Sequence, residues 1–576
     1  MTTYNGYEIN YTIEELEKMT TTDMTDVTLI SKDHPSYTNL TDGDKKALEH
    51  LVIAAKILNN VALIQDNALN IAQKKSLTEA SLQGDKHATL ALKLFNSLNG
   101  VAGLNGIDEK PITIFKNLNT PISKNFYPSD LSIEEFHNIL LKMFNNNQIE
   151  EIKKILSSRT MVVRDNDILK AIDYTVYFKD EFSLMANELE VASHYTTDAL
   201  FKEYLSWQAQ ALLQNNEDMD MLADKHWALM QDTPLEFTIS RENYDDEMTS
   251  TVLENKDLKA LIEQHNIEVV AKDMLGARVG IQNKEGTKLL LQFKDVMATL
   301  SSKMPYADKY EQTISQNEDI KQTMVDVDLV SLTGDYAQCR GGMTVAQNLP
   351  NNDKLSIKTG GGRRNVYHRQ VRSSHDPIRT QKMLDTFLHP SFHQYYNTEA
   401  DHIFVIGHEN GHSLGPSSEY QNSPGICKSI IEENKADTIS IAFMPEYLKN
   451  GVINETQLKE IYTSWITRRL LLSSKPIFPT ETYKIVDLIE FNKLLECGAI
   501  YFDENKLLHI EFDKVSPAIY ELLSEVINIQ LSKSPELAKA HIDKYSTWNE
   551  LHEYISSTQK KLGVKKYKNI VSFFEN

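Results

Sequence analysis

Apolar and polar residues alternate with two different periods along the chain. From about residue 12 to about residue 230, apolar residues recur with the 3.6-residue period of amphipathic helices, as in Lys46–Leu58. Further on, Leu235–Ile239 alternates with the two-residue period of a strand, and glycine-rich stretches follow. Amphipathic helix returns at Asp257–Met304 and dominates from about residue 380 onward. The pattern predicts an α+β protein that is predominantly α-helical.

The chain is too long for a single hydrophobic core. Its 576 residues exceed what one core normally serves, so we expect two lobes. The strand-like pieces on either side of the second helical stretch could form one small sheet, which would take the chain through the lobes more than once. The predicted boundaries are 1-262 for a mainly helical part of a mixed lobe, 263-330 for a helical insertion into the other lobe, 331-378 for a strand-rich return, and 379-576 for a helical catalytic lobe.

Composition narrows the range of partners. The chain has 60 Lys and Arg and 81 Asp and Glu, which gives a formal net charge of −21. This negative charge argues against binding to nucleic acid or to an anionic membrane. It favours cationic partners, such as peptides with free amino termini. The three cysteines are far apart, which is typical of free thiols in a reducing compartment. The N-terminus lacks the pattern of a signal peptide. We therefore expect a cytoplasmic protein, whose oligomeric state the sequence leaves open.

One pentapeptide carries candidate chemistry. His408-Glu409-Asn410-Gly411-His412 is an HExxH motif within a segment that is predicted to be helical, with Thr398 as a candidate N-cap and Gly415-Pro416 as a stop signal. Residues four apart share a helix face, so both imidazoles can reach one Zn²⁺ while Glu409 faces the water bound to it. The motif predicts a site for one zinc ion, with Glu409 as the catalytic base.

A catalytic zinc needs a third protein ligand. Glu433 follows 21 residues after His412, and Asp437 lies one helical turn further on, where it could hold a ligating histidine by its other ring nitrogen. Glu432 competes as the ligand, but the residue four positions after it is Ala436, which can orient nothing. We therefore predict Glu433 as the third metal ligand and Asp437 as the carboxylate that supports a ligating histidine.

Simpler interpretations exist for each of these residues. Two histidines on an apolar helix could be core residues, and an acidic pair on a helix is usually solvated; the agreement of spacing, helix and supporting carboxylate favours the metal site. His389 and His393 are also four apart, but Pro390 argues against a continuous helix, so we expect no second metal site from this pair.

An ordered set of motifs resembles the dipeptidyl peptidase III family of zinc metallopeptidases, in the bacterial form with a five-residue HExxH. The set spans roughly residues 120 to 500 and comprises Phe126-Tyr127-Pro128-Ser129-Asp130, Glu242-Asn243-Tyr244-Asp245-Asp246, Asn348-Leu349-Pro350-Asn351, His408 to His412 and Glu432 to Asp437. The resemblance implies two lobes separated by a wide cleft, a helical zinc lobe and a mixed lobe with a small β-barrel. It implies a zinc-dependent exopeptidase that releases dipeptides from the N-terminus of short oligopeptides.

The resemblance also implies roles for individual residues. His408, His412 and Glu433 look like the zinc ligands, and Glu242, Tyr244, Asn348 and Asn351 like the groups that hold the amino terminus of the peptide. Tyr483 is the nearest match to a histidine that stabilises the oxyanion in the family. Alternative functions are a zinc endopeptidase with the same site, or a catalytically weak, zinc-containing protein that binds peptides.

Overall fold

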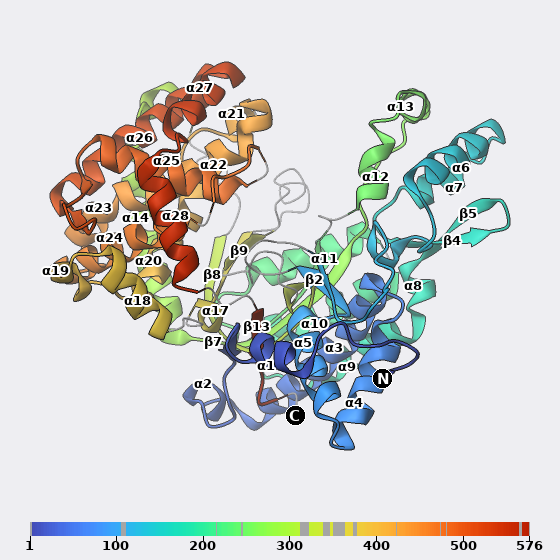
Figure 1. Ribbon diagram of the computed structural model, residues 1–576. Coiled ribbons are helices and arrows are strands. Elements are labelled where there is room, and N and C mark those ends of the chain that lie inside the picture. The colour runs from blue at the N-terminus through green and yellow to red at the C-terminus, as the bar shows by residue number, and fades with distance from the viewer. Residues whose placement is uncertain are drawn as a thin grey trace. The chain divides into compact units, whose positions relative to one another are not determined.

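The computed structural model divides into two compact units (Figure 1). It describes residues 3–104, 111–214, 216–242, 246–311, 322–337, 346–349, 363–372, 377–421, 423–472, 474–479, 481–563 and 567–574. The first unit contains Met1–Gln282, Val327–Thr344 and Lys565–Asn576, and the second contains Asn283–Asp326 and Val345–Val564. The chain therefore enters each unit more than once.

A layer of long helices forms the core of the first unit. Helix α3 (Asp42–Asp66) packs against α9 (Lys179–Tyr195) and strand β7 (Met274–Gln282), and α10 (Ala199–Gln214) packs against α9 and α11 (Glu217–Leu229). By length and composition α3 could cross a membrane, yet 56% of its most apolar window is buried against the rest of the protein. This burial is typical of a core helix. The remaining helices of eight or more residues here are α1 (Ile13–Thr20), α4 (Asn70–Leu82), α5 (Lys86–Leu98), α6 (Ile133–Asn145) and α13 (Lys256–Gln264).

The largest sheet has five strands in the order β6-β7-β8-β10-β9. Its strands are β6 (Leu235–Glu242), β7, β8 (Gln322–Gly334), β9 (Ala346–Leu349) and β10 (Arg363–His368). The pairs β6–β7, β7–β8 and β9–β10 are antiparallel. Among the described residues no pairing joins β6 to β9, so the small barrel that the resemblance implied is an open, curled half-barrel.

The other strands of the described residues form four two-stranded sheets. The parallel pair is β1 (Met24–Thr28) with β13 (Tyr567–Val571), and the antiparallel pairs are β2 (Ala102–Leu104) with β3 (Pro111–Thr113), β4 (Thr160–Asp165) with β5 (Ile168–Asp173), and β11 (Ile500–Phe502) with β12 (Leu508–Ile510).

The second unit is built around a helical core. Helix α20 (Thr398–His412) packs against α22 (Lys428–Ala442) and α24 (Glu455–Arg469), and α22 also packs against α25 (Thr482–Glu496) and α26 (Phe512–Ser532). Buried apolar side chains from these helices form one continuous cluster that includes Phe404, Ile430 and Trp465. Around them lie α14 (Lys284–Lys303), α18 (Pro377–Phe387), α27 (Pro535–Tyr545) and α28 (Glu550–Lys561).

The predominantly helical α+β class is confirmed, and one segment differs from its prediction. The expected helix over Asp257–Met304 is divided into α13, β7 and α14. All nine residues of β7 are buried, so the strand has an apolar run without the alternation of a half-exposed strand. The units divide after Gln282, Asp326, Thr344 and Val564, whereas the sequence suggested divisions after residues 262, 330 and 378.

Candidate metal centre

The two helices that carry the site cross at very short distance. A Cβ atom on Gly411 would lie 2.8 Å from the carbonyl oxygen of Ala436, and one on Gly407 would lie 2.3 Å from Oγ of Ser440. Ser440 donates a hydrogen bond of 2.7 Å from Oγ to the carbonyl oxygen of Phe404, which ties the helices together at the same crossing. Two glycines one turn apart on α20 therefore allow the acidic residues of α22 to reach the histidines.

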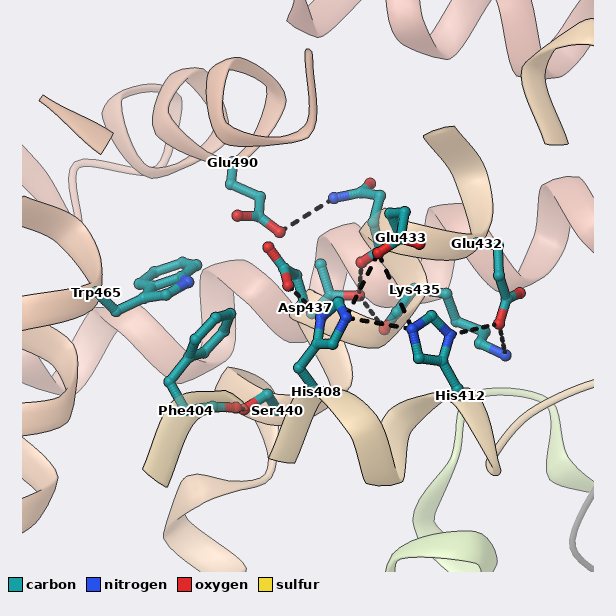
Figure 2. Close-up of polar contacts among 12 residues, drawn as sticks. Phe404, His408, His412, Glu432, Glu433, Lys435, Asp437, Ser440, Trp465 and Glu490 are labelled. Carbon is teal, nitrogen blue, oxygen red and sulfur yellow. Dashed lines mark hydrogen bonds and ion pairs between the residues drawn. The ribbon is translucent and has the colours of Figure 1, made fainter. Parts of the chain in front are cut away.

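Helix α20 begins and ends close to the predicted positions. Its N-cap is Asn397, whose side chain accepts a hydrogen bond from the amide of Glu399, rather than the predicted Thr398. The helix ends at His412, and Gly415 follows with φ +89°. Because His408 and His412 are four residues apart in the last turns of the helix, both side chains project from one face (Figure 2).

Three potential ligand atoms converge between α20 and α22. Nε2 of His408 lies 3.2 Å from Nε2 of His412 and 3.4 Å from Oε2 of Glu433, and Nε2 of His412 lies 3.9 Å from the same oxygen. Zinc with bonds of about 2.0–2.1 Å in tetrahedral geometry requires ligand atoms about 3.3 Å apart. Oε2 of Glu433 is buried without a hydrogen bond in the described structure. The three groups thus fit a single small cation of the zinc type.

A buried charge network holds His408. Its Nδ1 lies 2.5 Å from Oδ1 of Asp437, and the other oxygen of Asp437 accepts a hydrogen bond of 3.1 Å from Arg469. Nε of Arg469 donates to Glu490 at 2.9 Å, and both side chains are fully buried. Burial alone would lower the pKa of His408, but the charges of Asp437 and Glu433 and the hydrogen bond to Asp437 raise it well above its usual value. Asp437 thus lies in contact with His408, and its predicted role as the support of a metal ligand stays a prediction.

A different set of residues holds His412. Oε1 of Glu432 lies 3.2 Å from its Nδ1, and Lys435 and Gln530 contact Glu432 at 2.8 Å and 3.1 Å. Although burial would raise the pKa of Glu432, Lys435 and His412 lower it to about 2. Glu432 is thus an ionised acceptor behind the second histidine. The sequence analysis missed this role because it considered Glu432 only as a competing metal ligand, and nothing in the local spacing indicates that Gln530 of α26 lies beside it.

The predicted catalytic base lies beside these ligands. Glu409 follows His408 directly on α20 and is partly exposed, and no hydrogen bond or ion pair to its carboxylate is found within the described part of the chain. Its carboxylate is therefore available to a water molecule or a substrate. A carboxylate next to a metal-bound water is the arrangement that general-base catalysis requires.

The remaining predicted site residues are placed less fully. Tyr483 is in the first turn of α25 with 68% of its surface exposed, so its hydroxyl would stabilise an oxyanion in a solvated setting, where hydrogen bonds contribute less. Glu242 ends β6 and Asn348 is in β9, but their side chains, and all of Tyr244 and Asn351, lie outside the described residues. Their predicted roles stay predictions.

Comparisons with known proteins agree with the fold. No protein-family model matches the chain. Dipeptidyl peptidase III from Caldithrix abyssi superposes with a TM-score of 0.77 at 22% identity, covering 95% of this chain and 98% of that protein. The dipeptidyl-peptidase III structure from Corallococcus sp. strain EGB gives 0.67 at 17% identity, with 96% of each chain covered. The predicted resemblance is thus confirmed for the fold, and with it the two-lobe architecture.

A sequence relative has a different name. The chain is 23% identical over 572 residues to Nudix hydrolase 3 from Arabidopsis thaliana, with 88% of this chain and 68% of that protein covered. About a third of the relative therefore lies outside the match. At this identity its name does not transfer an activity to the present chain.

Proposed function

We propose that this chain is a zinc-dependent exopeptidase that releases dipeptides from the N-terminus of short peptides. The observation that carries the proposal is the convergence of His408, His412 and Glu433 at the separations of a tetrahedral zinc site. It occurs in a fold shared with two dipeptidyl peptidase III structures. The acidic charge of the chain suits substrates with free amino termini.

The residues around the centre would have different roles in peptide hydrolysis. A zinc ion held by the three side chains would polarise the scissile carbonyl and lower the pKa of a bound water. The carboxylate of Glu409 would take the proton from that water and pass it to the nitrogen of the leaving amine. Asp437 and Glu432 can accept hydrogen bonds from the Nδ1 atoms of the two histidines, which would leave each Nε2 lone pair available to bind a metal ion.

Release of dipeptides requires a fixed point for the amino terminus. The resemblance assigns this function to Glu242, Tyr244, Asn348 and Asn351. A carboxylate with amide and hydroxyl oxygens can hold an ammonium group, and a constant distance from this group to the zinc would select the second peptide bond. Tyr483 would donate a hydrogen bond to the oxyanion.

The decisive variant is Glu409→Gln. The amide keeps the size of the side chain but cannot accept the proton, so turnover should fall on the order of 10²-fold or more while zinc content stays at the wild-type level. Measuring kcat together with bound zinc tests both statements. Near-normal kcat in this variant would reject Glu409 as the base, and zinc-bound protein that binds peptides without cleaving them would favour the peptide-binding alternative.

Acetylated peptides test the exopeptidase specificity. Removing the ammonium leaves Glu242 unpaired, which should cost on the order of 2 to 4 kcal/mol, or roughly 30- to 1,000-fold in kcat/KM. Mass spectrometry should find dipeptides released stepwise from the free peptides. Internal cuts at equal rates in free and acetylated peptides would instead support the endopeptidase alternative.

A further inference from the structure

A second group of potential metal ligands lies in the same unit and shares no residue with the first. His389, Asp503 and His509 each place one ligand atom within 4.8 Å of those of the other two. We propose that these three residues form a second metal site, for zinc or a chemically similar divalent transition-metal ion. Two imidazoles and one carboxylate are ligands typical of such ions, whereas Mg²⁺ and Ca²⁺ prefer oxygen ligands.

The backbone holds the three residues in a fixed frame. Asp503 follows β11 and His509 is within β12, and these two strands form an antiparallel hairpin with Ile500 opposite Ile510. The amide of His389 donates a hydrogen bond of 3.0 Å to the carbonyl oxygen of Leu508, beside an isolated bridge between Leu388 and Leu508. Sequence positions more than a hundred residues apart are thus tied together directly beside the proposed ligands.

A separate contact orients the carboxylate of Asp503. Its Oδ1 accepts hydrogen bonds of 2.9 Å from the amides of Asn505 and Leu507 in the hairpin turn. The remaining oxygen, Oδ2, lies 3.2 Å from Nε2 of His509. This separation is close to the roughly 3.3 Å expected between neighbouring ligands of a tetrahedral zinc ion.

The two imidazoles are also held by neighbours. The ring of His509 stacks on Tyr501, with centroids 4.8 Å apart and planes inclined by 7°. Nδ1 of His389 lies 2.9 Å from Oγ of Ser391, so Nε2 is the atom left for a metal. Support of a ligand by a contact to its other polar atom is common in metal sites. The same arrangement occurs here at His408 and His412.

A simple ion pair explains only part of this cluster. A hydrogen bond between Asp503 and His509 leaves His389 unexplained, although its ring centroid lies only 4.3 Å from that of His509. The rings of the first candidate pair, His408 and His412, lie at a similar separation of 4.8 Å. The side chains of Asp503 and His509 are 25% and 20% exposed, so an ion can enter from solvent and water can complete its coordination.

The sequence analysis missed this site because it considered only His393 as a partner of His389. His393, four residues after His389, instead directs its Nε2 to the carbonyl oxygen of Leu388 at 2.9 Å and is not part of the cluster. It is therefore a matched control: a histidine of the same segment that the proposal excludes from binding.

Zinc titration of the full-length, metal-stripped chain tests the proposal. Calorimetry should find two equivalents of zinc in the wild-type protein and one in His408→Gln/His412→Gln. His509→Gln and His389→Gln should each weaken the second equivalent by at least about 10-fold, whereas His393→Gln should leave both unchanged. Zinc should also raise the Tm of the His408→Gln/His412→Gln protein, and this rise should disappear when His509→Gln is added.

The possible results separate this site from the proposed peptidase centre. A single equivalent in the wild-type protein that is lost in His408→Gln/His412→Gln would overturn the second site and leave the first intact. Two equivalents that persist in both His389→Gln and His509→Gln would place the second ion elsewhere and also overturn the proposal. Asp503→Asn keeps Oδ1 for the hairpin turn but loses the charge, so a weakened second equivalent in this folded variant would support it.

Discussion

The two sides of the metal centre are supported in different ways. His408 and His412 lie one turn apart on α20, but the Nδ1 of His408 contacts Asp437 at 2.5 Å, while that of His412 contacts Glu432 at 3.2 Å (Figure 2). Behind Asp437 lies fully buried Arg469, with Glu490 beyond it. The side chain of His408 is 13% exposed and that of His412 is 23% exposed.

This difference indicates which histidine the fold holds more firmly. A carboxylate in a buried network interacts more strongly with its partner because less water screens the charges. We therefore expect the His408 side to contribute more to metal affinity than the His412 side. Variants of the two sides can test this expectation directly.

Removing a ligand should have the largest effect on zinc affinity, and it should affect the His408 side and the His412 side alike. Glu433→Ala takes away the oxygen that lies near both Nε2 atoms, so zinc affinity should fall by more than about 100-fold, beyond the usual cost of losing a supporting residue. Competition with a chelator measures the affinity. Glu409→Gln is the control, because it retains all three ligands, and equal affinities of the two variants would exclude Glu433 as a ligand.

Widening the helix crossing should disturb both sides together. In Gly411→Ala the new methyl group meets the backbone of Ala436, which cannot move aside as a side chain can, so unfolding free energy should fall by about 1–3 kcal/mol. Denaturant titration measures the change. Gly407→Ala is the matched variant: its nearest obstacle is Oγ of Ser440, so adding Ser440→Ala should restore part of the loss. No recovery in that double variant would show that the crossing tolerates no extra volume at either glycine.

Much of this centre could be predicted from local spacing. HExxH predicted the helix and the shared face, and the four-residue step predicted that Asp437 supports a histidine near Glu433. The contact of Glu432 with His412, and the network of Arg469 and Glu490, could not be predicted in this way, because no sequence spacing relates these contacts to the motif and only the packed fold brings the residues together.

In the fold, too, features that depend on local sequence patterns could be predicted, whereas features that depend on long-range packing could not. Amphipathic periodicity predicted the helical class, whereas β7 was missed because both of its faces are buried and no polar residues mark its period. The cluster at His389 was missed because its other ligands follow more than a hundred residues later.

Removing one supporting carboxylate at a time should show how much each side of the centre contributes to zinc affinity. Asp437→Asn should weaken zinc binding by roughly 10- to 100-fold, the usual cost of losing a supporting group, and Glu432→Gln should have an effect near the lower end of that range. Asp437→Asn also leaves Arg469 with one fewer carboxylate in a buried site. Chelator competition on both variants gives the ratio of their zinc affinities. A larger loss of affinity in Glu432→Gln than in Asp437→Asn would reverse the proposed order of the two sides.

The smallest effect should be a pH dependence that belongs to the His408 side. In the metal-free protein the pKa of His408 is raised above 6.5, since Asp437 and Glu433 outweigh the lowering by burial. A raised pKa in the folded state stabilises the fold fully below the pKa of the unfolded chain, and the contribution is lost as pH rises through the folded value. The metal-free protein should therefore lose stability as pH increases above about 6.5.

Zinc should change the sign of this dependence, because a metal-bound His408 must be neutral and the ion competes with the proton. Thermal denaturation between about pH 6 and pH 9 should show the Tm of the stripped protein falling while the gain in Tm on adding zinc grows. Asp437→Asn should flatten both trends, since it removes the charge that raises the pKa of His408 most. Glu432→Gln is the matched comparison on the other side and should retain the trend that depends on His408. If the two variants flattened the profile equally, the titrating group would not be specific to the Asp437 side, and the contrast between the two histidines would fail.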